Sequence, residues 1–124
     1  MAPTTDFDLW LAGTFRAHGS FTALVVLVRI AEPAVTPLAS TFLTVVGDEV
    51  GWADMAALFT GAGRAWDGAV FFAQLDAGPL ENGAARARLR ALEQRMSADR
   101  LVINEGDFFD ALGRRLKVEE IPAH

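Results

Sequence analysis

The sequence predicts a single α+β domain over residues 1–124, with a four- to five-stranded mixed or antiparallel sheet and two or three helices packed on it. Two observations predict this class: a run of aliphatic and β-branched residues at 21–30, and an apolar stripe at helical spacing at 80–97. A length of 124 residues suits one domain, and 52% hydrophobic residues are enough for a core. The ends at 1–5 and 122–124 are expected to fray.

The first part of the chain is expected to contain a helix and two strands. Residues 6–18 carry aromatic and aliphatic side chains at helical spacing, with acids in the first turn and bases in the last. Some of these apolar residues also alternate as in a strand, and we favour the helix. Residues 21–30 are apolar at consecutive positions, which indicates a central strand covered on both faces. Pro33 and Pro37 should break the chain before a second strand at 41–46.

The middle of the chain predicts two helices around a third strand. Residues 52–59 place apolar side chains on one face of a short helix, which glycines then end. Residues 69–73 form the third strand. A Gly-Pro pair opens the helix at 80–97, whose apolar stripe includes Leu89 and Leu92, so both leucines should lie in the core.

The last part of the chain is expected to complete the sheet. Residues 101–103 predict a fourth strand, residues 110–113 a hairpin turn, and residues 115–119 a half-exposed strand. In the Phe pairs at 71–72 and 108–109, a strand directs adjacent rings to opposite faces. If helices cover only one face, the other rings need a partner surface or a ligand.

Composition excludes several classes of function. The chain has no Cys, which removes disulfides, thiol catalysis and thiolate metal sites, and which fits a cytoplasmic protein. The net charge of −5 disfavours binding to nucleic acid. The longest apolar run is too short for a membrane span, and the first residues lack the pattern of a secretory signal, so we expect a soluble protein. Ten Arg against one Lys, with 22 Ala, indicate a GC-rich, bacterial genome.

The candidates for catalysis are His18, Glu105 and Asp107. Histidine titrates near neutral pH and could act as a general base, and the two acids could form an acid and base pair or bind a hard cation. Each also has a local explanation, since His18 falls at a helix end and the acids flank Gly106 before a turn. The spacing matches no metal motif, so no metal site is predicted.

The candidates for a ligand pocket are Trp52, Arg64 and Trp66. The Gly-Ala-Gly segment at 61–63 begins like a dinucleotide fingerprint, but it lacks the third glycine and follows a predicted helix instead of a strand. No cofactor is therefore predicted.

An arginine-rich helix is the clearest charged feature. Its arginines give residues 84–100 a net charge of +3. We interpret them as a solvated face with some pairing to nearby acids, and a surface for an anion or an acidic partner as the second interpretation. The arginines are Arg86, Arg88, Arg90, Arg95 and Arg100.

These observations favour a small bacterial association or accessory module without catalytic activity. Two helices cover about one face of such a sheet, so a face or an edge would remain for a homodimer, unless residues 6–18 form a third helix. The alternative is a small-molecule-binding domain or modest enzyme with an aromatic-lined apolar pocket. Neither hypothesis involves nucleic acid or a membrane, and any ligand is unidentified.

We predict that the fold needs no metal, because the chain has no Cys and no paired His spacing. Thermal melts recorded with and without EDTA should coincide. A large loss of stability in EDTA would contradict this prediction.

Overall fold

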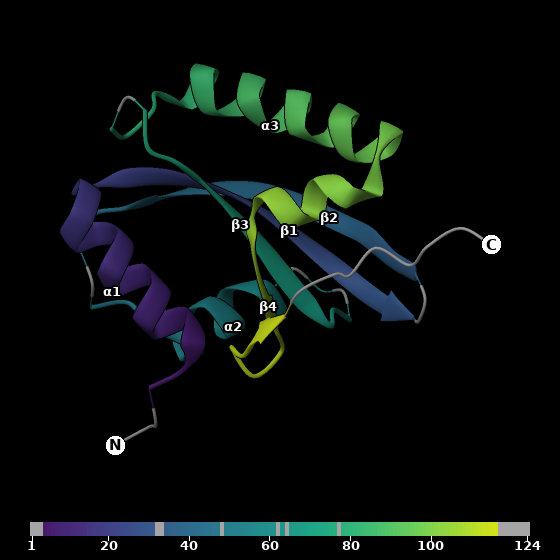
Figure 1. Ribbon diagram of the computed structural model, residues 1–124, viewed down its shortest axis with the longest axis horizontal. Coiled ribbons are helices and arrows are strands. Elements are labelled where there is room, and N and C mark those ends of the chain that lie inside the picture. Colours follow the sequence, from purple (N-terminus) through teal and green to yellow (C-terminus); the bar gives the residue numbers. More distant parts are fainter. Residues whose placement is uncertain are drawn as a thin grey trace.

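The chain forms a five-stranded antiparallel sheet with helices on both of its faces (Figure 1). The computed structural model describes residues 4–31, 34–47, 49–61, 63, 65–76 and 78–116. The elements in chain order are α1 (Asp6–His18), β1 (Phe21–Ala31), β2 (Ala34–Val45), α2 (Trp52–Thr60), β3 (Gly68–Gln74), α3 (Asn82–Ala98), the 3-10 helix η1 (Arg100–Glu105), β4 (Asp107–Asp110) and β5 (Arg115–Leu116). The predicted α+β class is confirmed.

The strands lie in the order β2-β1-β3-β4-β5, and every neighbouring pair is antiparallel. The long apolar strand β1 pairs with β2 on one side and with β3 on the other, as its sequence predicted. The first eight residues of β1 are all buried, because helices cover both faces there.

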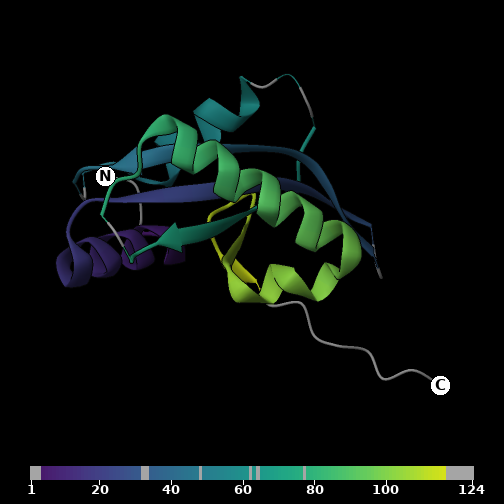
Figure 2. The same ribbon diagram turned by 90° about the horizontal axis from the view of Figure 1, so that it is seen from above.

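Alternate side chains of the sheet contribute to two separate cores. Helices α1 and α2 cover one face and α3 with η1 covers the other (Figures 1 and 2). The first core is rich in aromatic rings and consists of Phe7, Leu11, Phe21, Ala23, Val25, Leu27, Val45, Trp52, Met55, Phe59, Ala69, Phe71 and Phe109. The second is mainly aliphatic and consists of Leu24, Val26, Val28, Val70, Phe72, Leu89, Leu92, Met96, Val102, Ile103 and Phe108.

Residues 6–18 form the favoured helix, and its start is fixed by a capping box. The Thr5 hydroxyl accepts a hydrogen bond from the Asp8 backbone N–H, and the Asp8 carboxylate accepts one from the Thr5 N–H. The second oxygen of the same carboxylate accepts the backbone N–H of Trp52 at 2.8 Å. The Asp8 carboxylate therefore accepts backbone N–H groups at the start of both α1 and α2, and it links the two helices to each other.

The predicted strand at 101–103 is wrong, because these residues belong to the 3-10 helix η1. The Asp99 side chain accepts the Leu101 N–H and starts this helix. A strand would direct Val102 and Ile103 to opposite faces, whereas the helical turn buries both in the core beneath α3. The fourth strand is β4, and its two Phe rings lie in different cores as predicted.

Two further boundaries differ from the sequence prediction. Strand β2 begins at Ala34, and Pro37 lies inside it, where the pairing with β1 shifts register. Proline is tolerated there because β2 is an edge strand and the position is irregular. Helix α3 begins at Asn82, after the Gly-Pro pair, with Glu81 as its N-cap. Of the predicted strand at 115–119, residues 115–116 lie within the described residues, and they form β5.

The argument for a dimer from the sequence assumed an uncovered sheet face. Helix α1 packs on the same face of the sheet as α2, so this third helix covers area that two helices alone would leave open (Figure 1). The homodimer itself stays a prediction, and an edge of the sheet is one place for it.

Leu89 and Leu92 are buried in the second core, as the sequence predicted. We predict that Leu89→Ala lowers the free energy of unfolding by about 2–5 kcal/mol, from lost transfer energy and a residual cavity. Chemical denaturation measures this change. Arg90→Ala, on the exposed side of α3, is the control and should stay within about 0.5 kcal/mol of wild type. Equal effects would contradict the assignment of faces.

Candidate functional site

The residues that the sequence singled out lie in three different places. His18 is exposed in the last turn of α1. Trp52 and Trp66 pack with Phe59 in an aromatic cluster under α2, with ring centroids 5.5 to 6.2 Å apart. The indole N–H of Trp52 donates to the Ala111 carbonyl at 2.9 Å, so its polar atom is used within the fold. Arg64 lies outside the described residues.

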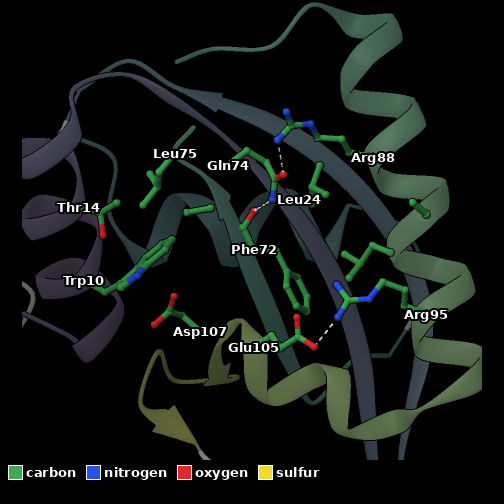
Figure 3. A pocket seen from close by; sticks show the side chains of 13 residues that line it. Trp10, Thr14, Leu24, Phe72, Gln74, Leu75, Arg88, Arg95, Glu105 and Asp107 are labelled. Carbon is green, nitrogen blue, oxygen red and sulfur yellow. Dashed lines mark hydrogen bonds and ion pairs between the residues drawn. The ribbon is translucent and has the colours of Figure 1, made fainter. Parts of the chain in front are cut away.

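Glu105 and Asp107, in contrast, both line a hollow of about 500 Å³, which we call the β3 groove. Its floor is the end of β3, one wall is α1, the other wall is α3, and the two acids close one end (Figure 3). The lining residues are Trp10, Thr14, Leu24, Phe72, Ala73, Gln74, Leu75, Arg88, Ala91, Leu92, Arg95, Glu105 and Asp107.

The groove exists because β3 continues further than its neighbour β4. The pairing of β3 with β4 stops at Phe71 opposite Asp107, while the pairing with β1 continues to Gln74 opposite Thr22. The chain before β4 turns away at Gly106, where an added Cβ would lie 2.7 Å from a Val70 methyl carbon. Only glycine allows this close approach, and no strand of the described residues pairs with the end of β3 on this side, between the two helices.

The wall formed by α1 is aromatic, and the wall formed by α3 is basic. Trp10 and Thr14 are half-buried on the α1 side (Figure 3). Arg88 and Arg95 extend from α3 toward the same hollow, with exposed Ala91 between them. A ligand in the groove would therefore meet an aromatic surface on one side and guanidinium groups on the other.

Each arginine of the groove is held by an acid. The Arg88 guanidinium donates two hydrogen bonds to Asp76, at 2.7 and 2.8 Å, and one to the Gln74 side-chain oxygen at 2.9 Å. Arg95 donates to Glu105. These pairs are exposed, so they contribute little to stability, but they fix where the guanidinium groups lie.

The ion pairs also shift the pKa values of their members. The hydrogen bond from Arg88 lowers the pKa of Asp76 from 3.8 to about 2. The bond to Asp76 raises the pKa of Arg88, and the bond to Glu105 raises the pKa of Arg95. Both guanidinium groups remain charged at any pH at which the fold exists.

Asp107 belongs to a separate contact at the end of the groove. Its carboxylate accepts a hydrogen bond from Arg115 at 2.8 Å, and Arg115 also lies over the Phe109 ring, 5.0 Å from the centroid. Glu105 and Asp107 thus lie at the same hollow, yet each is bound by an arginine. Each of the two carboxylates at the hollow therefore has a cationic partner.

A second open stretch of backbone is the free edge of β2. Within the described part of the chain this strand pairs only with β1, and none of its twelve residues is charged. Two smaller hollows lie along it, one of about 390 Å³ beside Pro37 to Ser40 and one of about 260 Å³ beside Thr44 to Val46. Val46, just after the strand, is 74% exposed.

Sequence reasoning did not find the main residues of the groove. Trp10 belongs to the aromatic residues at helical spacing in 6–18, and its ring does pack against the aromatic core, but this spacing did not indicate that it also lines a groove. Arg88 and Arg95 were interpreted as part of a solvated helix face. Pairing of those arginines with nearby acids was expected and is observed. The step between β3 and β4 depends on long-range pairing, and no local pattern in the sequence indicates it.

Comparisons with models of protein families, with curated proteins and with solved structures found no match. Among the described residues, no group of His, Asp and Glu side chains could hold a metal ion. None of the described helices has both the length and the hydropathy needed to cross a bilayer.

We predict that the Asp76 carboxyl titrates with a pKa of about 2, because the Arg88 guanidinium stabilises its charged form. The Arg88–Asp76 contact should be complete above pH 4 and should be lost as the pH falls through about 2. Carboxyl-detected NMR titration measures this pKa. In Arg88→Ala the pKa should return toward 3.8, whereas Arg90→Ala should leave it unchanged. An unshifted pKa in wild type would contradict the contact.

Proposed function

We propose that this protein is a non-catalytic association module that forms a homodimer through the free edge of β2. The observation that carries the proposal is the edge itself, which has twelve residues and no charged side chain. An edge strand presents unpaired backbone N–H and C=O groups, and natural proteins usually protect such edges with charges, prolines or bulges.

In β2, the features that hinder pairing with another strand lie only near its start. Pro37 and the register shift beside it interrupt the strand near its start. From Ser40 to Val45 the pairing with β1 is regular, and the other side of this segment has no neighbouring strand among the described residues. This six-residue segment is long enough to accept another strand.

A second copy of the chain is the occupant that this edge fits best. Two β2 strands related by a two-fold axis would pair antiparallel, which joins two sheets into one. Because β2 carries no charge, the copies would meet without like-charge repulsion along the strand. Val46 and Val50 are exposed beside the segment and would add apolar area to the contact.

The placement of the catalytic candidates supports a role in association. His18 is exposed on α1 and does not line the groove. Glu105 and Asp107 are each bound by an arginine.

We predict a dimer at micromolar concentration, with twice the monomer mass of 13.3 kDa in sedimentation equilibrium. The double variant Ser40→Lys with Thr44→Lys places charges on the β2 edge and should sediment as a monomer. The control is Ala87→Lys with Gln94→Lys, which adds the same charge on exposed positions of α3 and should remain dimeric. A monomeric wild type, or an equally dimeric edge variant, would overturn the proposal.

A further inference from the structure

The open end of β3 has backbone groups directed into the groove. An added Cβ at Gly106 would lie 3.0 Å from the Phe71 carbonyl oxygen, so this carbonyl faces the side where β4 lies. Alternate residues of a strand direct their amide groups to the same side. The N–H and C=O of Ala73 therefore face this side as well, beyond the end of β4, where the described part of the chain places no strand.

We propose that the β3 groove binds an extended peptide segment of a partner protein, in which an apolar residue is flanked by acidic residues. The segment adds as a short strand beside Ala73 and takes the position that β4 would occupy if it continued. A peptide backbone supplies one acceptor and one donor at the spacing of a strand, which matches the paired groups of Ala73.

The side-chain pattern follows from the two walls. A residue opposite Ala73 points to the same face as Ala73, which packs against the aromatic core on the side of α1. There it meets Trp10 and Thr14, so an apolar side chain fits this position (Figure 3). Its two neighbours point to the other face, toward Arg88 and Arg95 on α3.

The arginines can donate hydrogen bonds to acidic ligand residues and keep their present contacts. A guanidinium has five N–H donors. The described contacts of Arg95 use one of them, for Glu105, and those of Arg88 use three, for Asp76 and Gln74. Both arginines line the hollow, so a ligand carboxylate there could accept hydrogen bonds from the remaining donors. The two carboxylates of the groove, Glu105 and Asp107, are each bound by an arginine already, so a basic ligand residue would meet no carboxylate that lacks a cationic partner.

The size of the groove agrees with such a ligand. A hollow of about 500 Å³ lies within the range of ligand sites in proteins. The half-buried Trp10 ring offers a rigid apolar contact, which is typical of residues that dominate peptide and protein interfaces. This site lies on the opposite side of β1 from the β2 edge, so peptide binding and dimerisation use different strands.

The test is calorimetric titration with two blocked heptapeptides that differ only in a central Glu-Leu-Glu or Lys-Leu-Lys segment. Wild type should bind the acidic peptide at least about tenfold more tightly than the basic one. Ala91→Glu places a carboxylate in the groove, four residues before Arg95, and should weaken binding by about tenfold or more. The matched control Ala87→Glu, exposed but outside the groove, should bind like wild type.

Amide hydrogen exchange of the same samples tests how the peptide binds. Strand addition should slow exchange of the Ala73 N–H in the complex, because a peptide carbonyl then accepts it. The dimer-edge variant Ser40→Lys with Thr44→Lys should bind the acidic peptide as wild type does. The proposal is overturned if the acidic peptide does not bind at millimolar concentration, or if the basic peptide binds with equal affinity. It is also overturned if the acidic peptide binds without slowing exchange of the Ala73 N–H, or if blocked leucine alone binds as tightly as the acidic peptide.

Discussion

The rest of the structure depends on a strand that must be covered on both faces. The first eight residues of β1 are buried without interruption, so the sheet can expose neither side at this strand. Burial of aliphatic side chains contributes about 25 cal/mol per Å² of apolar surface, which makes an uncovered face costly. Helix α1 precedes β1 in the chain and covers one face, while α3 comes much later and covers the other.

The aromatic core is also the place where the two ends of the described chain meet. The Phe7 ring packs against Trp52, Phe71 and Phe109, with centroids 4.9 to 5.4 Å apart. Its backbone N–H donates to the carbonyl of Gly113, which has a positive φ of 78° in the turn before β5. An added Cβ at Gly113 would lie 2.7 Å from the Trp52 ring. A glycine is therefore needed for both the turn and the packing.

The parts of the fold that could be predicted are those set by local pattern. The strand at 21–30 and the helices at 6–18 and 80–97 follow from runs and periods of apolar residues, and the structure contains all three. Residues 101–103 could not be assigned this way, because a short apolar run fits a strand and a helical turn equally well. The 3-10 helix forms because the Asp99 side chain caps its start and because Val102 and Ile103 are both buried in the core beneath α3.

The candidate site was predictable only in part, for a different physical reason. Glu105 was singled out by its residue type, and the structure places it at the groove. The groove itself, however, results from the point at which two strands stop pairing, and that point is set by contacts between segments far apart in sequence. Trp10 illustrates the difference, since its helical spacing predicts a core residue whether or not a strand lies beside it.

Unequal strand lengths explain why a groove forms here. Strand β3 has seven residues, β4 has four and β5 has two, so the sheet narrows toward this edge. Helices α1 and α3 have 13 and 17 residues. At 1.5 Å per residue they are about 20 and 26 Å long, against about 14 Å for a four-residue strand. Residues of both helices line the hollow beyond the end of β4, where one more strand could lie. Fixed arginines on one side and Trp10 on the other give that space its chemical character.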